Sequence, residues 1–105
     1  MKYPIKYTKE AIEDIGRIYD EVYNACLDHN VTKKYLNELI DKIVLISDFP
    51  NSGSPLCYGK FISDYRYIVY KSYLAFYYIS NEAIFIDRIL FAKSDYIKKL
   101  RLWTA

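Results

Sequence analysis

Residues 65–99 read YRYIVYKSYLAFYYISNEAIFIDRILFAKSDYIKK, and they are the most informative part of the chain. Three runs of aromatic and β-branched residues are separated by short polar segments at Lys71-Ser72 and at residues 80–82. This is the pattern of consecutive strands joined by tight turns. Ser94 or Asp95 can then cap a short helix that contains Arg101 and Leu102 and carries positive charge. The stretch therefore predicts three strands followed by a helix.

The predicted strands at residues 73–79 and 84–91 are apolar or aromatic on both faces. One face must pack on helices, and the other is too apolar to be simply solvated. Seven of the 13 tyrosines lie between Tyr58 and Tyr78, and tyrosine suits a half-exposed sheet or an interface. We therefore expect a small module whose sheet contacts a partner.

The N-terminal part predicts a strand and a helix. In residues 3–7, Tyr3, Ile5 and Tyr7 alternate with Pro4 and Lys6, which is a strand pattern. Pro4 places this strand at a sheet edge because proline cannot donate a ladder hydrogen bond. Thr8 is the predicted cap of the helix, and we attribute Gly16 to the close approach of a second helix. Three-to-four spacing predicts a buried stripe of Ile12, Ile15, Tyr19, Val22 and Cys26.

A second helix is predicted after a connection at residues 28–30, with Thr32 as its cap and Pro50 beyond its end. Its inward residues would be Leu36, Leu39, Ile40, Ile43 and Ile46. Residues 50–61, PNSGSPLCYGKF, contain two prolines and two glycines and predict a long loop.

The order β-α-α-β-β-β-α predicts an α+β fold of one domain over residues 1–105. In this fold a helical hairpin packs on a small, mostly antiparallel sheet, with a short C-terminal helix. The residues that we expect to be buried include Ile15, Leu39, Ile43, Phe76 and Ile86.

Composition narrows the class of protein. The chain has 105 residues, of which 52% are hydrophobic, enough for a core without disulfides or metal. Cys26 and Cys57 stand alone, with no C-x-x-C pair, so we expect reduced thiols and no zinc site, a disulfide being the alternative. No run approaches the ~18 apolar residues of a membrane span, and the N-terminus has no apolar signal core, so we expect a cytoplasmic protein.

Charge is unevenly distributed along the chain. Residues 1–59 hold seven Lys/Arg and nine Asp/Glu, whereas residues 60–105 hold eight Lys/Arg and four Asp/Glu. The net charges are therefore −2 and +4. The sheet half is the expected face for an anionic partner, and the asymmetry favours an acidic protein or a few phosphate contacts over sequence-blind RNA binding.

Several segments resemble the RelE/ParE superfamily of toxins from bacterial type II toxin–antitoxin systems. They are YPIKYTKEAIEDIGRIYDEV at residues 3–22, FPNSGSPL at 49–56, SYLAFYYI at 72–79 and IFIDRILFAKSDY at 84–96. The resemblance covers nearly the whole chain and implies a cytosolic toxin that a co-expressed antitoxin neutralises. RelE-like members cut messenger RNA in the ribosome, whereas ParE-like members poison DNA gyrase without being nucleases.

Cleavage of RNA by a RelE-like enzyme requires several convergent cations and an acid or base. Arg66 matches a basic position of the family, but three positions where RelE-like members carry basic residues hold Ile68, Leu74 and Phe91-Ala92. The remaining catalytic candidates are Arg66, Lys93 and Tyr96. His29, the single histidine, lies between the predicted helices and is expected to be a surface residue. We expect no metal and no small-molecule cofactor.

The candidates for contact with a target or partner are Arg66, Tyr73, Arg88, Lys93, Tyr96 and Lys98. Each has a structural alternative: Arg66 can pair with Asp64 or Asp87, Arg88 can tether the sheet to a helix, and Lys98 can belong to a solvated helix face.

Three functions stay open. The favoured one is a ParE-like toxin that binds gyrase or an unknown target. The alternatives are a divergent RelE-like, ribosome-dependent mRNA endoribonuclease, and a degenerate toxin kept as an antitoxin-binding subunit.

Overall fold

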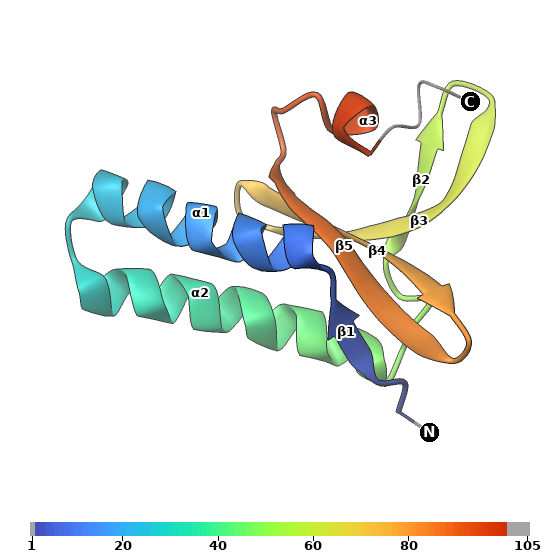
Figure 1. The fold of residues 1–105 in the computed structure, drawn as a ribbon, viewed down its shortest axis with the longest axis horizontal. Helices are drawn as coiled ribbons and strands as arrows, with labels where there is room; N and C mark the ends of the chain where they lie inside the picture. The colour runs from blue at the N-terminus through green and yellow to red at the C-terminus, as the bar shows by residue number, and fades with distance from the viewer. Residues whose placement is uncertain (1, 101–105) are drawn as a thin grey trace.

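The computed structural model describes residues 2–100, without the side chains of Tyr58 and Phe61, so Arg101 and Leu102 of the predicted last helix lie outside it. Its elements are β1 (Ile5–Tyr7), α1 (Lys9–Cys26), α2 (His29–Val44), a 3₁₀ turn (Leu45–Ser47), β2 (Ser54–Tyr58), β3 (Phe61–Tyr70), β4 (Tyr73–Ser80), β5 (Ala83–Phe91) and α3 (Tyr96–Lys99). Helices α1 and α2 lie side by side as a hairpin against the sheet, and α3 lies apart from them (Figure 1).

The sheet has the strand order β1-β5-β4-β3-β2. Strand β1 is an edge strand that runs parallel to β5, and the other pairs are antiparallel. The predicted helical hairpin on a mostly antiparallel sheet is therefore confirmed. The predicted loop at residues 50–61 is wrong in part, because β2 pairs with β3 there. Pro55 is compatible with a strand at this position because β2 is an edge strand.

The two long helices begin at side-chain caps. Thr8 caps α1 as predicted, with its Oγ1 accepting a hydrogen bond from the Ala11 N–H at 3.1 Å. Helix α2 begins four residues earlier than predicted, because Asp28 and not Thr32 caps it, accepting from the N–H groups of Asn30 and Val31. Thr32 instead lies buried in the first turn and donates its hydroxyl back to the Asp28 carbonyl.

The main core lies between the helical hairpin and the sheet. Leu39, Ile43 and Ile86 are buried there as predicted, and Ile15 is half-buried; Phe76 is also buried as predicted, but on the opposite face of the sheet. The predicted stripe on α1 is partly wrong: Ile12 is 59% exposed and Cys26 is exposed. The buried positions of α1 are Ala11, Asp14 and Ile18. An acidic residue therefore occupies the inward face of the helix.

The opposite face of the sheet carries a second apolar cluster. Its buried members are Leu56, Leu74, Phe76, Leu90 and Leu100, with Tyr65, Tyr67, Tyr96 and Ile97 packed around them. Leu56 comes from β2, and Leu100 follows α3, so the chain itself covers much of the apolar surface that we expected a partner to cover.

Gly16 is exposed, and a Cβ built on it would meet nothing within 4 Å. The predicted close approach of a second helix at this residue is therefore wrong. Alanine loses less backbone entropy than glycine in a helix, so we predict that Gly16→Ala raises the free energy of unfolding by about 0.5–1 kcal/mol. Chemical denaturation measures this change.

Gly53→Ala should change the free energy of unfolding in the opposite direction. A Cβ at Gly53 would lie 2.7 Å from Cε1 of the fully buried Tyr77. We expect this substitution to lower the free energy of unfolding by about 1–3 kcal/mol. Equal effects of the two alanines would contradict the packing described for both glycines.

Candidate partner-binding surface

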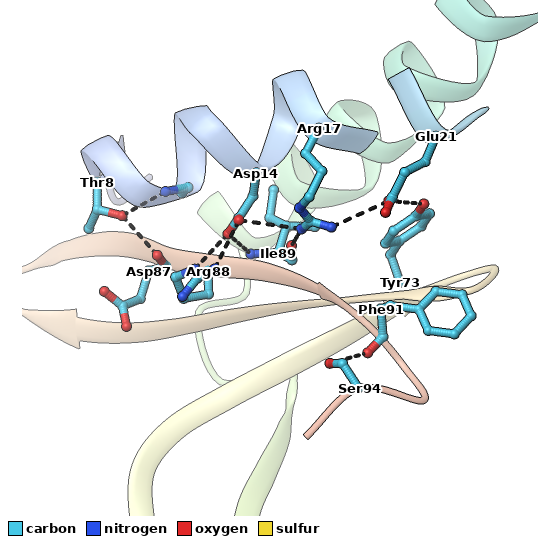
Figure 2. A network of polar contacts seen from close by, with 11 residues as sticks. Thr8, Asp14, Arg17, Glu21, Tyr73, Asp87, Arg88, Ile89, Phe91 and Ser94 are labelled. Carbon is cyan, nitrogen blue, oxygen red and sulfur yellow. Dashed lines mark hydrogen bonds and ion pairs between the residues drawn. The ribbon is translucent and has the colours of Figure 1, made fainter. Parts of the chain in front are cut away.

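Helix α1 begins where β1 stops covering the edge of β5. Strand β1 pairs with β5 only as far as Ile86, and the chain then enters α1 at Thr8. Thr8 joins the two elements, because its N–H donates to the Ile86 carbonyl at 3.1 Å and its hydroxyl donates to the Asp87 carbonyl at 2.8 Å. Beyond Asp87, α1 and not a strand lies along this edge of β5 (Figure 2).

Two side chains of α1 form hydrogen bonds with the backbone at the edge of β5 that β1 does not cover. The register between β4 and β5 shifts at Asp87, which is an extra residue in β5. Past this bulge, the Ile89 N–H donates to the Asp14 carboxylate at 2.9 Å, and the Ile89 carbonyl accepts from Arg17 Nη2 at 2.9 Å. Asp14 and Arg17 thus form the hydrogen bonds to the Ile89 backbone that a neighbouring strand would otherwise form.

Asp14 is also the centre of a charge cluster. Its carboxylate accepts from Arg88 Nε at 2.8 Å and Arg88 Nη2 at 3.0 Å, and Arg17 Nη2 lies 3.3 Å from it (Figure 2). Asp14 is only 4% exposed, so two guanidinium groups and a backbone N–H compensate its burial. The hydrogen bond to Asp14 raises the pKa of Arg88 above its usual value. The alternative that Arg88 tethers the sheet to a helix is therefore observed.

Two adjoining cavities follow this seam, and both are lined by Arg88 and Lys99. We call them together the α1–α3 groove. The larger, of about 500 Å³, is lined by Arg17, Glu21, Tyr73, Arg88, Leu90, Phe91 and Lys99. The smaller, of about 330 Å³, is lined by Thr8, Glu10, Tyr65, Asp87, Arg88, Lys99 and Leu100. The larger cavity combines three cations with the apolar side chains of Leu90 and Phe91, and Phe91 is 40% exposed.

Tyr73 forms one wall of the larger cavity and is mostly buried. Its hydroxyl donates to Glu21 Oε1 at 2.8 Å, and the same oxygen lies 3.3 Å from Arg17 Nη1. Its ring meets Phe91 edge-on, with the two centroids 6.0 Å apart. The structure therefore brings two of the predicted binding residues, Tyr73 and Arg88, to the same cavity.

Arg66 lies away from the groove. Its Nη1 donates to the carbonyls of Gly53 at 2.8 Å and Asn51 at 3.2 Å. The predicted pairing with Asp64 or Asp87 is wrong: the Asp87 carboxylate accepts from the Tyr65 hydroxyl at 2.6 Å, and no ion pair of Arg66 is found within residues 2–100.

The remaining predicted residues lie around α3. Lys93 is exposed in the turn after β5, and Lys98 is exposed on α3 itself. Tyr96 is half-buried, with its ring centroid 5.2 Å from that of Phe76. The three catalytic candidates thus have different surroundings: Arg66 binds loop carbonyls, Tyr96 packs on the sheet, and Lys93 faces solvent.

His29 is exposed at the tip of the helical hairpin, as predicted. It stacks on Tyr23 with 4.4 Å between ring centroids, and its Nδ1 lies 2.7 Å from the Tyr19 hydroxyl. In the part of the chain that the structure describes, no group of three or more His, Cys, Asp or Glu residues is placed to hold a metal ion. No helix among the same residues is long and apolar enough to span a membrane.

The sequence analysis missed Asp14, Arg17, Glu21 and Lys99. Asp14 had a detectable signal, since it lies three residues after Ala11 and four before Ile18, on the buried face of α1. Arg17 and Glu21 are four residues apart on one helix, a spacing at which opposite charges pair.

Removing the Asp14 carboxylate should be costly. Asp14→Ala leaves the Ile89 N–H and the Arg88 guanidinium without their acceptor, so we predict a loss of about 3 kcal/mol in the free energy of unfolding. The matched control is Glu13→Ala, which removes an exposed carboxylate from the same helix and should change stability by less than about 0.5 kcal/mol. Similar effects of the two variants in chemical denaturation would contradict the role of Asp14.

Stability should fall at alkaline pH. Burial, and then a hydrogen bond to a carboxylate, raises the pKa values of Tyr65, Tyr70 and Tyr73 above the ordinary value of tyrosine. A raised pKa means that the folded chain holds these protons more tightly, so the stabilisation is complete below about pH 10 and is lost as pH rises further. Denaturation between pH 8 and about pH 11 measures the slope, which Tyr73→Phe should reduce; an unchanged slope would contradict this assignment.

Residues 5–96 match the family described as the ParE toxin of the type II toxin–antitoxin system parDE. No curated protein matches the chain. A solved structure described as the chromosomal ParDE toxin–antitoxin system from P. aeruginosa has the same fold, with a TM-score of 0.73 and 18% identity, and the match covers 88% of this chain and 98% of that one. Because the family match spans most of its residues, the chain belongs to the ParE toxin family of type II toxin–antitoxin systems.

Proposed function

We propose that this chain acts in the cytoplasm as the toxin of a type II pair, is neutralised by a cognate antitoxin, and inhibits its target by binding. DNA gyrase is the proposed target, because ParE-like members of the superfamily poison that enzyme. Membership of the ParE family supports this proposal.

The chemistry of the sheet also supports a binding function over RNA cleavage. The face opposite the helical hairpin is filled by Leu74, Phe76 and Leu90, with Leu100 and Tyr96 packed on them. Stabilising a charged phosphorane requires convergent cations, and apolar side chains at these positions supply none. Arg66, the basic residue that matches the family position, is bound to the carbonyls of residues 51 and 53.

The α1–α3 groove is the proposed site for the antitoxin. The observation that carries this assignment is the larger cavity, where Arg17, Arg88 and Lys99 surround Leu90 and Phe91. Apolar side chains of an amphipathic segment fit the two hydrophobic residues, and its carboxylates fit the cations. The net charge of +4 on residues 60–105 also attracts an acidic partner.

Charge reversal tests the groove. We predict that Lys99→Glu weakens binding of the antitoxin by roughly 10-fold or more, which corresponds to about 1.4 kcal/mol. Lys33→Glu makes the same change at an exposed position of α2 and serves as the control, with an expected effect under about 3-fold. Titration calorimetry with the purified antitoxin measures both; equal losses would indicate a general charge effect and would contradict the groove as the site.

Toxicity and its cause are tested in cells. Induction of the chain without antitoxin should stop growth and change DNA supercoiling, with no new mRNA ends. Codon-phased mRNA cuts that disappear in Arg66→Ala and Lys93→Ala would instead support the RelE-like alternative. Binding of the antitoxin without any toxicity would support a degenerate toxin kept as an antitoxin-binding subunit.

A further inference from the structure

Strands β3 and β4 separate before either strand ends. Their paired residues run from Tyr70–Tyr73 to Arg66–Tyr77, although β3 extends back to residue 61 and β4 extends on to residue 80. The next hydrogen-bonded rung of this ladder would join Asp64 to Ile79, two residues beyond the last pair. Those two residues instead both line a cavity of about 470 Å³.

A bulge in β3 lies where the two strands separate. The pairing of β2 with β3 shifts register between Pro55 and Cys57, so that three residues of β3 oppose Leu56 alone. The buried Ser63 fixes the bulge, because its hydroxyl donates to the Leu56 carbonyl at 2.7 Å and accepts from the Tyr65 N–H at 3.1 Å. With both contacts made inside the β2–β3 hairpin, β3 turns away from β4.

The separation leaves a strand edge of β4 facing the cavity. Asn81 and Glu82 both have positive φ and close a two-residue turn, so the flanking pair Ser80–Ala83 exchanges hydrogen bonds. Hydrogen-bonded and non-hydrogen-bonded pairs alternate along an antiparallel ladder, so the next pair, Ile79–Ile84, exchanges no hydrogen bonds. The N–H and carbonyl of Ile79 therefore point away from β5 and toward the cavity, which we call the β3–β4 notch.

The side chains around the notch add aromatic and cationic contacts. Its lining residues are Asp64, Tyr65, Arg66, Tyr78, Ile79 and Ser80. The rings of Tyr65 and Tyr78 meet edge-on with 5.9 Å between centroids. Arg66 has only carbonyl oxygens as hydrogen-bond acceptors among the described residues, so its positive charge has no carboxylate partner there.

We propose that the β3–β4 notch binds an extended segment of the antitoxin, which supplies the missing rung. Its backbone would pair with the N–H and carbonyl of Ile79, as in recognition by strand addition, and a carboxylate in the segment would approach Arg66. Three extended residues span about 10 Å, enough to cross this short edge. The inference rests on the proposed function, since it adds a second contact site for the same partner.

Amide hydrogen exchange tests the notch directly on the wild-type chain. The purified protein of the neighbouring antitoxin gene is added in excess, and exchange of the Ile79 N–H is compared with that of Tyr78, which the ladder directs to β5. We expect Ile79 to exchange rapidly in the free toxin and at least roughly 100-fold more slowly in the complex. A complex that forms without protecting Ile79 overturns the notch proposal and leaves the proposed function standing.

A proline variant gives a second, independent readout. Ile79→Pro removes the N–H that faces the notch and keeps every rung to β5, whereas Ile79→Val keeps the N–H and is the control. We expect the proline variant to bind the antitoxin roughly 5- to 10-fold more weakly than the valine variant, the loss of one backbone hydrogen bond. Equal affinities of two folded variants overturn the proposal.

The remaining outcomes are also decisive. If the proline variant does not fold, the exchange measurement on the wild-type chain decides alone. Protection of Ile79 that grows with toxin concentration and needs no antitoxin assigns the notch to a second copy of this chain and overturns the proposal. If the antitoxin forms no complex with the chain, both the proposed function and the notch assignment are overturned. This outcome differs from a complex in which the Ile79 amide stays unprotected, because no binding is detected at all.

Discussion

The Asp14 carboxylate accepts a hydrogen bond from the backbone N–H of Ile89, and this contact sets how helix α1 packs on the sheet. Strand β1 is too short to cover β5, so the edge beyond Asp87 would be left with unpaired backbone groups. The free-energy cost of burying such groups without partners exceeds the stabilisation from most packing contacts. Asp14 and Arg17 supply the partners, and their positions on α1 then fix the height and rotation of the helical hairpin over the sheet.

Two bulges lie beside the surfaces that we propose as contact sites. The one at Asp87 turns Arg88 toward Asp14 and places its guanidinium between both cavities of the α1–α3 groove. The one held by Ser63 separates β3 from β4 and opens the β3–β4 notch. Bulges interrupt the ladder at a cost and recur where a side chain must be redirected. In this chain, both proposed contact sites for the antitoxin lie next to one.

The sequence predicted most of the fold because its signals are local. Alternation and three-to-four spacing located β1, β3, β4, β5 and both long helices, and the resemblance to RelE/ParE toxins agrees with the family match. Strand β2 was missed because Pro55 and the flanking glycines indicate a loop, and only pairing with β3 makes it a strand. Asp14 was missed because spacing arguments assign acidic residues to solvent. The partners of Arg66 are backbone carbonyls of a distant loop, which no residue pattern reveals.

Hydrogen exchange of the Ile89 amide measures whether the Asp14 carboxylate protects this edge of β5. Its neighbour Leu90 pairs with Leu74 in the ladder, whereas the Ile89 N–H has a side-chain carboxylate as its acceptor. If Asp14 replaces a strand at this edge, the Ile89 amide of the free toxin should exchange as slowly as that of Leu90, at the rate of global unfolding. Exchange of Ile89 at the rate of an open strand edge, with Leu90 still protected, would contradict the account.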